Sequence, residues 1–337
     1  MLEAFFATER GSLQDTTVRG SFDLEQELVW IDLIAPTQEE QQWVEDAYGQ
    51  TLPTIRSLED ISSSARYYRD DDGILHISTY FLSKNKSLQA DNEDEDNSHI
   101  LATAQTVAFI LSKERLYTLR GEKMVSFRAF RARARRNDYD IDYKDPIWIL
   151  LGLLEAKVDE LADILEDVHR DLEKYSTEVL NNHHRENVLD LDDMVTRLAQ
   201  QEDVLGKAQL CLIDLRRVLT FLSRPRALGS HIYDVDVREL TEDVRSLVEH
   251  DTFLYQKVRF LLDTTSGFIN TEQSDTIRRF SILPSMLAPP MLIASIYGMN
   301  TESLPFAHGH YSFFLVIFIV LLFFIGPLIY FRTKKWI

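Results

Sequence analysis

The chain has 337 residues, of which 45% are hydrophobic and 27% charged, and its formal net charge is −18. This length allows about two domains. The acidic balance argues against a nucleic-acid-binding protein, which needs a basic surface, and is compatible with attracting cations. The single cysteine, Cys211, excludes an internal disulfide and a cysteine-based metal cage. Glu3 stands where a signal peptide has Lys or Arg, and no long apolar run follows, so we expect no cleaved signal.

Residues 1–145 are expected to form a mixed α/β domain. A strand is predicted over 28–36, and a helix follows it, with Thr37 and Glu40 spaced as a capping box and Gly49 at its end. β-Branched and aromatic residues predict further strands in three stretches: 73–83, 106–112 and 115–121.

Two stretches of this domain carry charge of one sign. The acidic stretch 90–98 is expected to be a solvated linker, with a cation-attracting loop as the alternative. The basic stretch 127–136 is expected to be a helix whose Phe127, Phe130 and Ala134 face inward. Contact of its arginines with anionic lipid or with acidic neighbours is the alternative.

Long helices are predicted after residue 145. Asp145 and Pro146 suit an N-cap and a first helical position. Apolar residues then alternate spacings of three and four from Leu151 to Leu172, and again from Leu191 to Leu222, which predicts two coiled helices. Turn residues lie between them, and His183 and His184 there are read as an exposed turn rather than as metal ligands. The two seams predict an antiparallel helical hairpin over 146–235.

A third seam starts near Asp236 and keeps heptad spacing from Leu240 to Phe268. No clear stop precedes Pro284. One helix from Asp236 to Asn300 would be about 95 Å long at 1.5 Å per residue. We expect a stalk over 236–280 that continues directly into a membrane span.

Two stretches near the end, 281–301 and 303–331, contain no Asp, Glu, Lys or Arg. Each is long enough to cross a hydrocarbon core about 30 Å thick. We therefore expect membrane spans over 281–300 and 312–331, an external loop over 301–311, and a basic tail over 332–337. Because basic residues flank the spans only on the side of the two termini, both termini should be cytoplasmic.

The first span contains Pro284, Pro289 and Pro290. Proline removes an amide donor and frees carbonyl groups that lipid cannot satisfy. We therefore expect this span to lie inside an assembly and line a wet path, with the second span facing lipid. Two spans are too few to enclose a path, so several copies must assemble around an axis.

The chain lacks the usual motifs of an enzyme site: the phosphate-binding loop, HExxH, cysteine pairs and the GxSxG elbow. We expect no enzymatic activity and no driving nucleotide. Asn300, at the outer end of the first span, would offer a ring of carboxamide oxygens to the water shell of a hydrated cation, and Mg²⁺ holds its water reluctantly. Gly298 would let backbones come close, and Glu302 would add negative charge outside.

At this point the sequence resembles a known family. The tetrapeptide YGMN at 297–300, after a proline-interrupted span and before a short loop, a second span and the ending KKWI, is similar to the CorA family of two-span divalent-cation transporters. The stretches 29–36, 58–77 and 287–300 also look like bacterial CorA, so the resemblance covers nearly the whole chain.

The resemblance implies an α+β fold: an N-terminal cytoplasmic α/β domain, long coiled helices with a stalk, and two C-terminal transmembrane helices, assembled as a funnel-shaped homopentamer. It implies a bacterial inner membrane protein, in contact with lipid, that passes Mg²⁺ and, less selectively, Co²⁺ or Ni²⁺. It also implies gating by cytoplasmic Mg²⁺, bound between acidic side chains of neighbouring subunits and released when the level falls.

The same resemblance assigns roles to residues of this chain. The selectivity filter would be Gly298, Met299 and Asn300. The pore-lining candidates recur at roughly helical spacing: Ser295, Met291, Ala288, Ile277, Ser274 and, as an inner acidic ring, Asp263. A surface carboxylate is the alternative for Asp263. The candidates for the regulatory metal are Glu239, Glu242, Asp243, Asp70, Asp71 and Asp72.

Three departures from the family leave the ion open. Met291 stands where the family has a pore-facing Thr, and Ser274 where many members have Asn. The loop 303–309 replaces the usual MPEL and brings His308 and His310 near the mouth, and imidazole suits Zn²⁺ or Ni²⁺ better than Mg²⁺. We weigh Mg²⁺ above Zn²⁺, the ion of the ZntB branch. A membrane-tethered scaffold or signalling protein is the alternative from another class.

Overall fold

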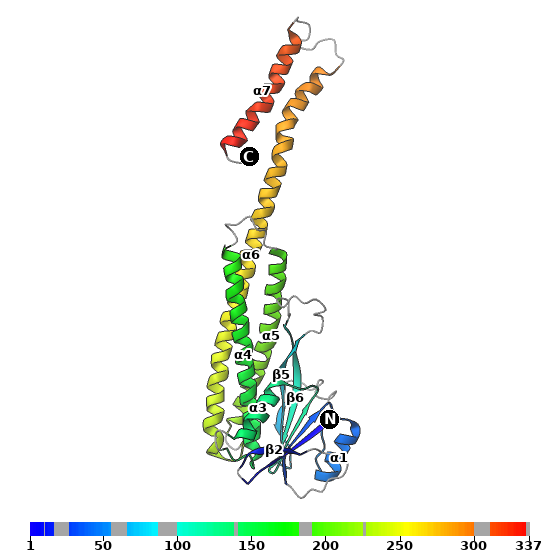
Figure 1. The fold of residues 1–337 in the computed structure, drawn as a ribbon, viewed down its shortest axis with the longest axis vertical. Helices are drawn as coiled ribbons and strands as arrows, with labels where there is room; N and C mark the ends of the chain where they lie inside the picture. Colours follow the sequence, from blue (N-terminus) through cyan, green and yellow to red (C-terminus); the bar gives the residue numbers. More distant parts are fainter. Residues whose placement is uncertain are drawn as a thin grey trace. The chain divides into compact units, whose positions relative to one another are not determined.

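The structure is a computed structural model, and it describes residues 1–9, 11–16, 27–54, 66–86, 100–137, 141–181, 191–224, 227–299 and 311–334. The chain forms two compact units, the first made of residues 1–189 and 196–261 and the second of residues 190–195 and 262–337. The ribbon in Figure 1 follows the sequence from blue to red. The acidic stretch 90–98 and the pair His183 and His184 lie outside the described residues.

The first unit contains a seven-stranded mixed sheet with the strand order β2-β1-β3-β7-β6-β5-β4. Its strands are β1 (Leu2–Ala7), β2 (Leu13–Thr16), β3 (Leu28–Ile34), β4 (Tyr67–Arg69), β5 (Leu75–Lys86), β6 (Ile100–Leu111) and β7 (Leu116–Arg120). Only β3 and β7 pair in parallel, and all other described neighbours are antiparallel. The predicted strands β3, β5, β6 and β7 are confirmed, whereas β1, β2 and β4 were not predicted.

The central strand β3 has a core on both of its faces, because every one of its residues is buried. On one face Ile31 and Leu33 join a cluster that includes Val44 of α1 (Gln38–Tyr48). On the other face the Trp30 ring lies 5.7 Å from that of Phe130 in α3 (Val125–Arg136). A strand that is covered on both sides reads as a continuous apolar run, as this one does.

The predicted caps of α1 are confirmed. The Thr37 side chain accepts a hydrogen bond from the Glu40 backbone amide, and the Glu40 side chain accepts one from the Thr37 amide. Gly49 ends the helix in the left-handed region, at φ 67°, a conformation that costs glycine little.

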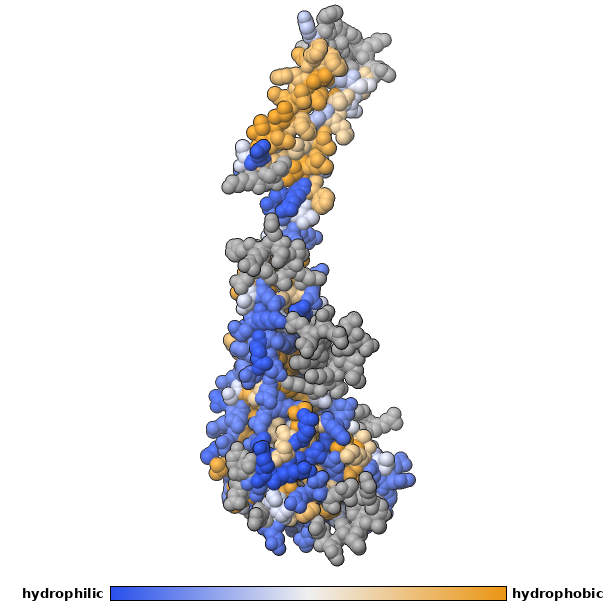
Figure 2. All heavy atoms as spheres, viewed as in Figure 1, coloured by the Kyte–Doolittle hydropathy of each residue, from blue (hydrophilic) through white to orange (hydrophobic). Residues whose placement is uncertain are grey.

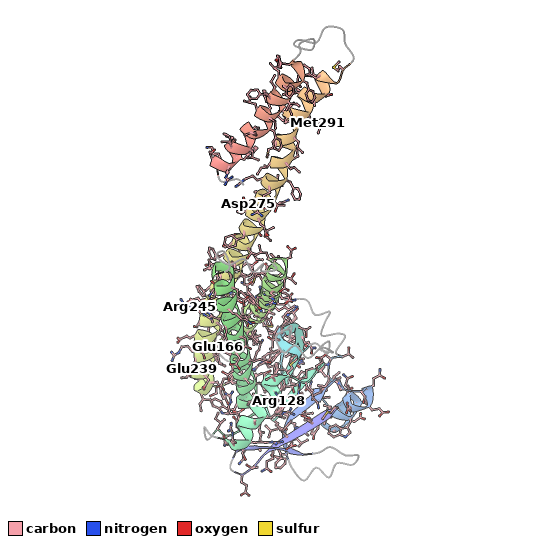
Figure 3. All side chains as sticks on the ribbon, turned by 45° about the horizontal axis from the view of Figure 1, so that its top comes forward. Arg128, Glu166, Glu239, Arg245, Asp275 and Met291 are labelled. Atoms are coloured by element: carbon pink, nitrogen blue, oxygen red, sulfur yellow. The ribbon has the colours of Figure 1, made fainter. Side chains whose placement is uncertain are left out.

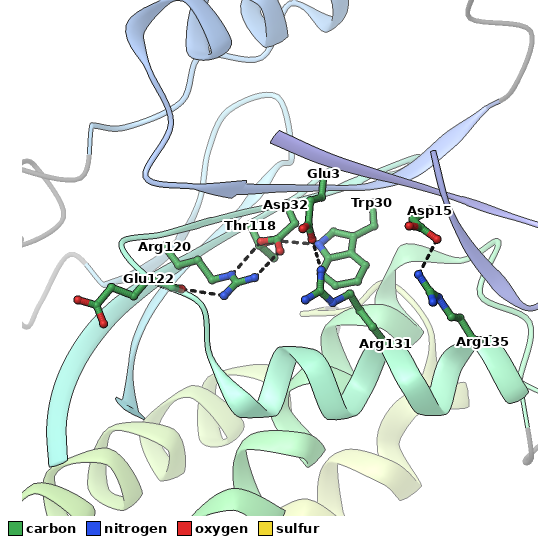
Figure 4. Close-up of polar contacts among 9 residues, drawn as sticks. All are labelled: Glu3, Asp15, Trp30, Asp32, Thr118, Arg120, Glu122, Arg131 and Arg135. Atoms are coloured by element: carbon green, nitrogen blue, oxygen red, sulfur yellow. Dashed lines mark hydrogen bonds and ion pairs between the residues drawn. The ribbon is translucent and has the colours of Figure 1, made fainter. Parts of the chain in front are cut away.

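The basic stretch forms α3, as predicted, and its inward residues are all buried: Phe127, Phe130 and Ala134. Its arginines meet carboxylates of the chain itself. Arg131 pairs with Glu3, and Arg135 pairs with Asp15 at 2.6 Å (Figure 4). The alternative contact with acidic neighbours is thus made, at least in part, within the chain.

A buried polar group lies between the sheet and α3 (Figure 4). The Arg120 guanidinium donates to both carboxylate oxygens of Asp32, at 3.1 and 2.7 Å, and both side chains are fully buried. The Thr118 hydroxyl donates to Asp32 at 2.7 Å, and the Trp30 indole donates to Thr118 at 3.0 Å. Every charge here has partners, which burial in a protein interior requires.

Two long helices, α4 (Pro146–Asn181) and α5 (Leu191–Leu222), pack antiparallel. Thr79 of β5 hydrogen-bonds both Lys157 of α4 and Asp214 of α5, at 2.8 and 2.6 Å. Further along, Gln201 donates to Asp171 at 3.2 Å. From the first of these contacts to the second, the residue numbers rise along α4 and fall along α5, which confirms the predicted antiparallel pair.

The first part of α6 (Asp234–Tyr297) lies along both helices. The Tyr255 hydroxyl bonds Glu202 of α5 at 3.0 Å, and Lys257 pairs with Glu173 of α4. The seam residues of the three helices are largely buried, including all seven predicted for α4, from Leu151 to Leu172. The predicted coiled packing is therefore confirmed.

Gly152 explains how closely α4 approaches α3. A Cβ at this position would lie 2.4 Å from Cε2 of Phe130, which is closer than real Cβ contacts. Only glycine therefore fits without moving the Phe130 ring, which is itself 1% exposed.

The second unit contains the last part of α6 and α7 (Ser312–Thr333). Both helices are long and apolar enough to cross a membrane. Apolar residues cover α7 and the part of α6 beside it in the space-filling view (Figure 2). Since α7 is apolar all round and exposed in a single chain, it needs lipid or further protein around it.

Candidate functional site

The last part of α6 stays helical through Pro284, Pro289 and Pro290. Each proline deprives the carbonyl four residues earlier of its helical donor. On the same segment the hydroxyls of Ser281 and Ser285 each donate to the carbonyl four residues earlier, at 2.7 Å. These serines are therefore satisfied within the helix, which allows polar side chains in an apolar span.

One face of this segment is covered within the chain. Ile282 and Met286 are only 8% and 7% exposed, and Pro290, four residues further, is also buried. The red helix α7 runs beside this part of α6 in both views (Figures 1 and 3). The stripe of residues at every fourth position therefore packs toward α7.

The predicted pore-lining residues of the span lie on the uncovered face. Met291 is 66% exposed, and Ala288 and Ser295 are also exposed. Met286 and Ser295 are nine residues apart, about two and a half turns at 3.6 residues per turn, so they lie on opposite faces of α6. Figure 3 shows Met291 on this last part of the helix.

The remaining pore candidates precede the span and are exposed as well. Ile277 is 58% exposed, and Asp263 and Ser274 belong to the same class. The Ser274 hydroxyl donates to the Asn270 carbonyl at 2.8 Å. In a single chain these side chains have no cover, as expected of residues that meet other copies or water.

Sequence reasoning missed further members of this face. Exposed residues recur at seven-residue spacing along α6: Phe260, Gly267, Ser274, Ser281, Ala288 and Ser295. These residues share one heptad position on α6. That position comes two residues after the one occupied by a buried series: Val244, Asp251, Val258 and Thr265. The signal was present in the sequence, but after Phe260 it is carried by small and polar residues instead of leucines.

Two of the residues predicted for the filter, Gly298 and Met299, lie where α6 ends. The helix closes at Tyr297, the Gly298 amide donates to the Ala294 carbonyl at 3.0 Å, and the Met299 amide to the Ile296 carbonyl at 3.3 Å. A Cβ on Gly298 would lie 3.3 Å from the Ala294 carbonyl oxygen, so this turn favours glycine. Asn300, Glu302, His308 and His310 lie outside the described residues.

The acidic candidates for a regulatory metal fall in two places. Glu239, Glu242 and Asp243 are exposed on the first part of α6, where Figure 3 labels Glu239. Asp70, Asp71 and Asp72 form the turn between β4 and β5. Among the described residues, no three His, Cys, Asp or Glu side chains gather closely enough to hold a metal ion.

Asp70 is already engaged within its own turn. Its carboxylate accepts from the Ile74 amide at 2.8 Å and contacts His76 Nε2 at 3.1 Å. Desolvation acts to raise the pKa of Asp70, but these hydrogen bonds outweigh it and hold the pKa below the ordinary value. Asp70 is thus a turn-forming residue in a single chain, whereas Asp71 and Asp72 are exposed.

Comparisons with known proteins agree with this architecture. Residues 25–335 match the family described as CorA-like Mg²⁺ transporter protein. The magnesium transport protein CorA of Haemophilus influenzae is 37% identical over 315 residues, covering 92% of both chains. That of Sodalis glossinidius is 38% identical over 331 residues, covering 98% of this chain and 95% of the relative.

A solved structure shares the fold at low sequence identity. The complete CorA magnesium transporter from Methanocaldococcus jannaschii superposes with a TM-score of 0.76 at 18% identity, and the match covers 100% of this chain and 99% of the other. This supports the α+β architecture of a mixed sheet, long helices and two C-terminal apolar helices. The chain belongs to the family of CorA-like Mg²⁺ transporter proteins.

Proposed function

We propose that this chain assembles as a homopentamer in a bacterial inner membrane and conducts Mg²⁺ through a pore lined by α6. The observation that carries the proposal is the uncovered face of the first span. Opposite an apolar, α7-covered stripe, it exposes Ala288 and Ser295 together with Met291. The relatives named as magnesium transport proteins support the same ion.

In such an assembly every residue of the uncovered face becomes a ring. The Asn300 carboxamides would accept hydrogen bonds from the water shell of the ion, which is cheaper than stripping water that Mg²⁺ holds tightly. Gly298 and Met299 would complete the filter. The side chains of Ser295 and Ser274 would form polar rings along the pore. Those of Met291 and Ile277 would form apolar constrictions, which close a pore by excluding water.

The membrane potential supplies the driving force. About 2.3 kcal/mol per charge per 100 mV amounts to about 4.6 kcal/mol for a divalent ion entering a negative interior. With basic residues before the first span and after the second, both termini would lie in the cytoplasm, and the stretch 301–311 would be external. The domain of residues 1–145, the hairpin over 146–235 and the stalk over 236–280 would then be cytoplasmic.

Gating by intracellular Mg²⁺ follows from the acidic stalk. Exposed Glu239, Glu242 and Asp243 would face carboxylates of a neighbouring copy, including Asp71 and Asp72, and repel them until divalent ions bind. High internal Mg²⁺ should therefore lower flux and protect the first unit from protease. Equal cleavage with and without Mg²⁺ would count against this gate.

The other ions are part of the proposal. Co²⁺ and Ni²⁺ would pass less selectively, because a filter that reads the water shell discriminates weakly among ions of equal charge. His308 and His310 favour Zn²⁺ transport of the ZntB type as the second candidate. A membrane-tethered scaffold would have no need of the prolines or the small, polar face of the first span.

Purified protein in liposomes with an internal Mg²⁺ dye tests the function. We expect potential-driven Mg²⁺ entry that Asn300→Ala abolishes and that Asn97→Ala, an asparagine outside the spans, leaves intact. Parallel runs with Co²⁺, Ni²⁺ and Zn²⁺ rank the ions. Flux that does not depend on Asn300, or no flux at all, would remove the transport proposal.

A further inference from the structure

A cavity in the first unit lies apart from the proposed conduction path and shares one residue, Glu239, with the proposed gate. It has a volume of about 510 Å³ and lies between α3, the start of α4 and the start of α6. This volume is within the range of small-molecule sites, roughly 300–1,000 Å³. One wall is aromatic, formed by Phe130, Tyr143 and Trp148. Phe130 and Tyr143 are 1% and 3% exposed, so the rings are held in place by the core.

The polar part of the cavity is acidic. Its charged lining residues are Arg133, Glu155, Asp236 and Glu239. Arg133 is already paired with Glu155 at 2.8 Å and with Asp159, outside the cavity, at 2.7 Å. Within the described part of the chain, Asp236 and Glu239 form no ion pair, and they belong to the same helix, one turn apart. The cavity therefore has an excess of negative charge on the α6 side.

The carboxylates also affect one another. Burial raises the pKa of Glu155, and the nearby charges of Asp159 and Glu239 raise it further, against the lowering effect of Arg133. Repulsion of this kind is relieved when a cation enters. A bare metal ion would make no use of the apolar walls, and no three carboxylates among the described residues gather closely enough to hold one.

We propose that this cavity binds an organic diamine or polyamine, with ammonium groups at Asp236 and Glu239 and methylene groups against Trp148, Leu151 and the neighbouring rings. The aromatic faces attract an ammonium group, and burial of each methylene adds to affinity. A bound amine would neutralise Glu239, one of the carboxylates of the acidic stalk. The proposal does not depend on the ion pathway, because binding is measured without flux.

The full-length protein in detergent, titrated calorimetrically with 1,5-diaminopentane and with spermidine, tests the site. We expect one site per chain, and affinity that rises with the number of methylenes in diamines of equal charge. Asp236→Asn with Glu239→Gln should weaken binding about tenfold, the equivalent of two moderately exposed ion pairs. The matched control Glu249→Gln, an exposed carboxylate of α6 outside the cavity, should bind as the unmodified protein does.

Three results would overturn the proposal. They are the absence of saturable binding up to about 1 mM amine, equal affinity in the double variant, and affinity that is independent of chain length and matched by Mg²⁺. The last result would assign the carboxylates to counterion binding alone. The diamine series needs no substitution, so the test stands even if a variant does not fold.

Discussion

Asp251 is a buried carboxylate on the apolar seam of α6, and replacing it by leucine should stabilise the protein. It is 1% exposed and lies in a seam with Val244, Leu254 and Val258. Among the described residues, no group donates a hydrogen bond to its Oδ1. Burial raises the pKa of Asp251 from 3.8 to about 6, and no charged neighbour contributes to that shift. The ionised form is therefore disfavoured in the folded state.

The size and sign of the effect follow from this pKa. A difference of about 2 between the folded and the unfolded pKa corresponds to about 3 kcal/mol, at 1.36 kcal/mol for each pKa unit. Because the folded pKa is the higher one, this cost is complete above about pH 6 and disappears as pH falls toward 3.8. Asp251→Leu should thus raise the melting temperature most at pH 8, by about 6–12 °C at most.

The assay is thermal unfolding of the full-length protein in detergent, followed by circular dichroism between pH 8 and pH 4.5. Because other ionisable groups can also change protonation between these pH values, the quantity to compare is the difference between the variant and the unmodified protein. Glu249→Leu, at an exposed carboxylate of the same helix, is the control and should give a small difference at every pH. A difference for Asp251→Leu that stays constant from pH 8 to pH 4.5 would refute the reasoning.

Two further substitutions test the packing that holds the first unit together. Gly152→Ala should lower the unfolding free energy by about 1–3 kcal/mol, because the added Cβ meets the Phe130 ring. The control Gly206→Ala, which has open space around it on α5, should raise the unfolding free energy by about 0.5–1 kcal/mol. Equal effects of the two substitutions in denaturant unfolding would contradict this. Asp32→Ala should cost about 3–5 kcal/mol, because it leaves Arg120 buried and unpaired, and Asp32→Leu with Arg120→Met should cost clearly less. A double variant as unstable as the single one would show that the ion pair itself is required.

Much of the fold followed from local patterns in the sequence. Thr37, Glu40 and Gly49 marked both ends of α1, and the leucine spacing marked α4, α5 and the first part of α6. Strands β2 and β4 were missed because they are short, and β1 was missed because LEAFFA does not alternate between apolar and polar residues. Their pairing depends on distant strands, which local patterns do not specify.

The buried polar contacts could not be predicted from the sequence, for the same reason. The bonds from Thr79 to Lys157 and Asp214 join residues 78 and 135 positions apart, and the Asp32–Arg120 pair spans 88. The exposed face of α6 that carries predicted pore residues followed in part from the sequence, since Ser274, Ala288 and Ser295 keep one heptad phase. The cavity between α3, α4 and α6 was not predictable, because it forms only where these three helices meet.

The central claim, that identical α6 helices surround a water-filled path, is tested most directly by thiol accessibility. The natural cysteine should not react with a thiol reagent, because Cys211 is fully buried and burial raises the pKa of its thiol to about 11. We predict that a charged, membrane-impermeant thiol reagent blocks Mg²⁺ flux through Ala288→Cys and Ser295→Cys proteins but not through Met286→Cys, on the face packed toward α7. Block at Met286→Cys together with free flux at the other two positions would contradict the account.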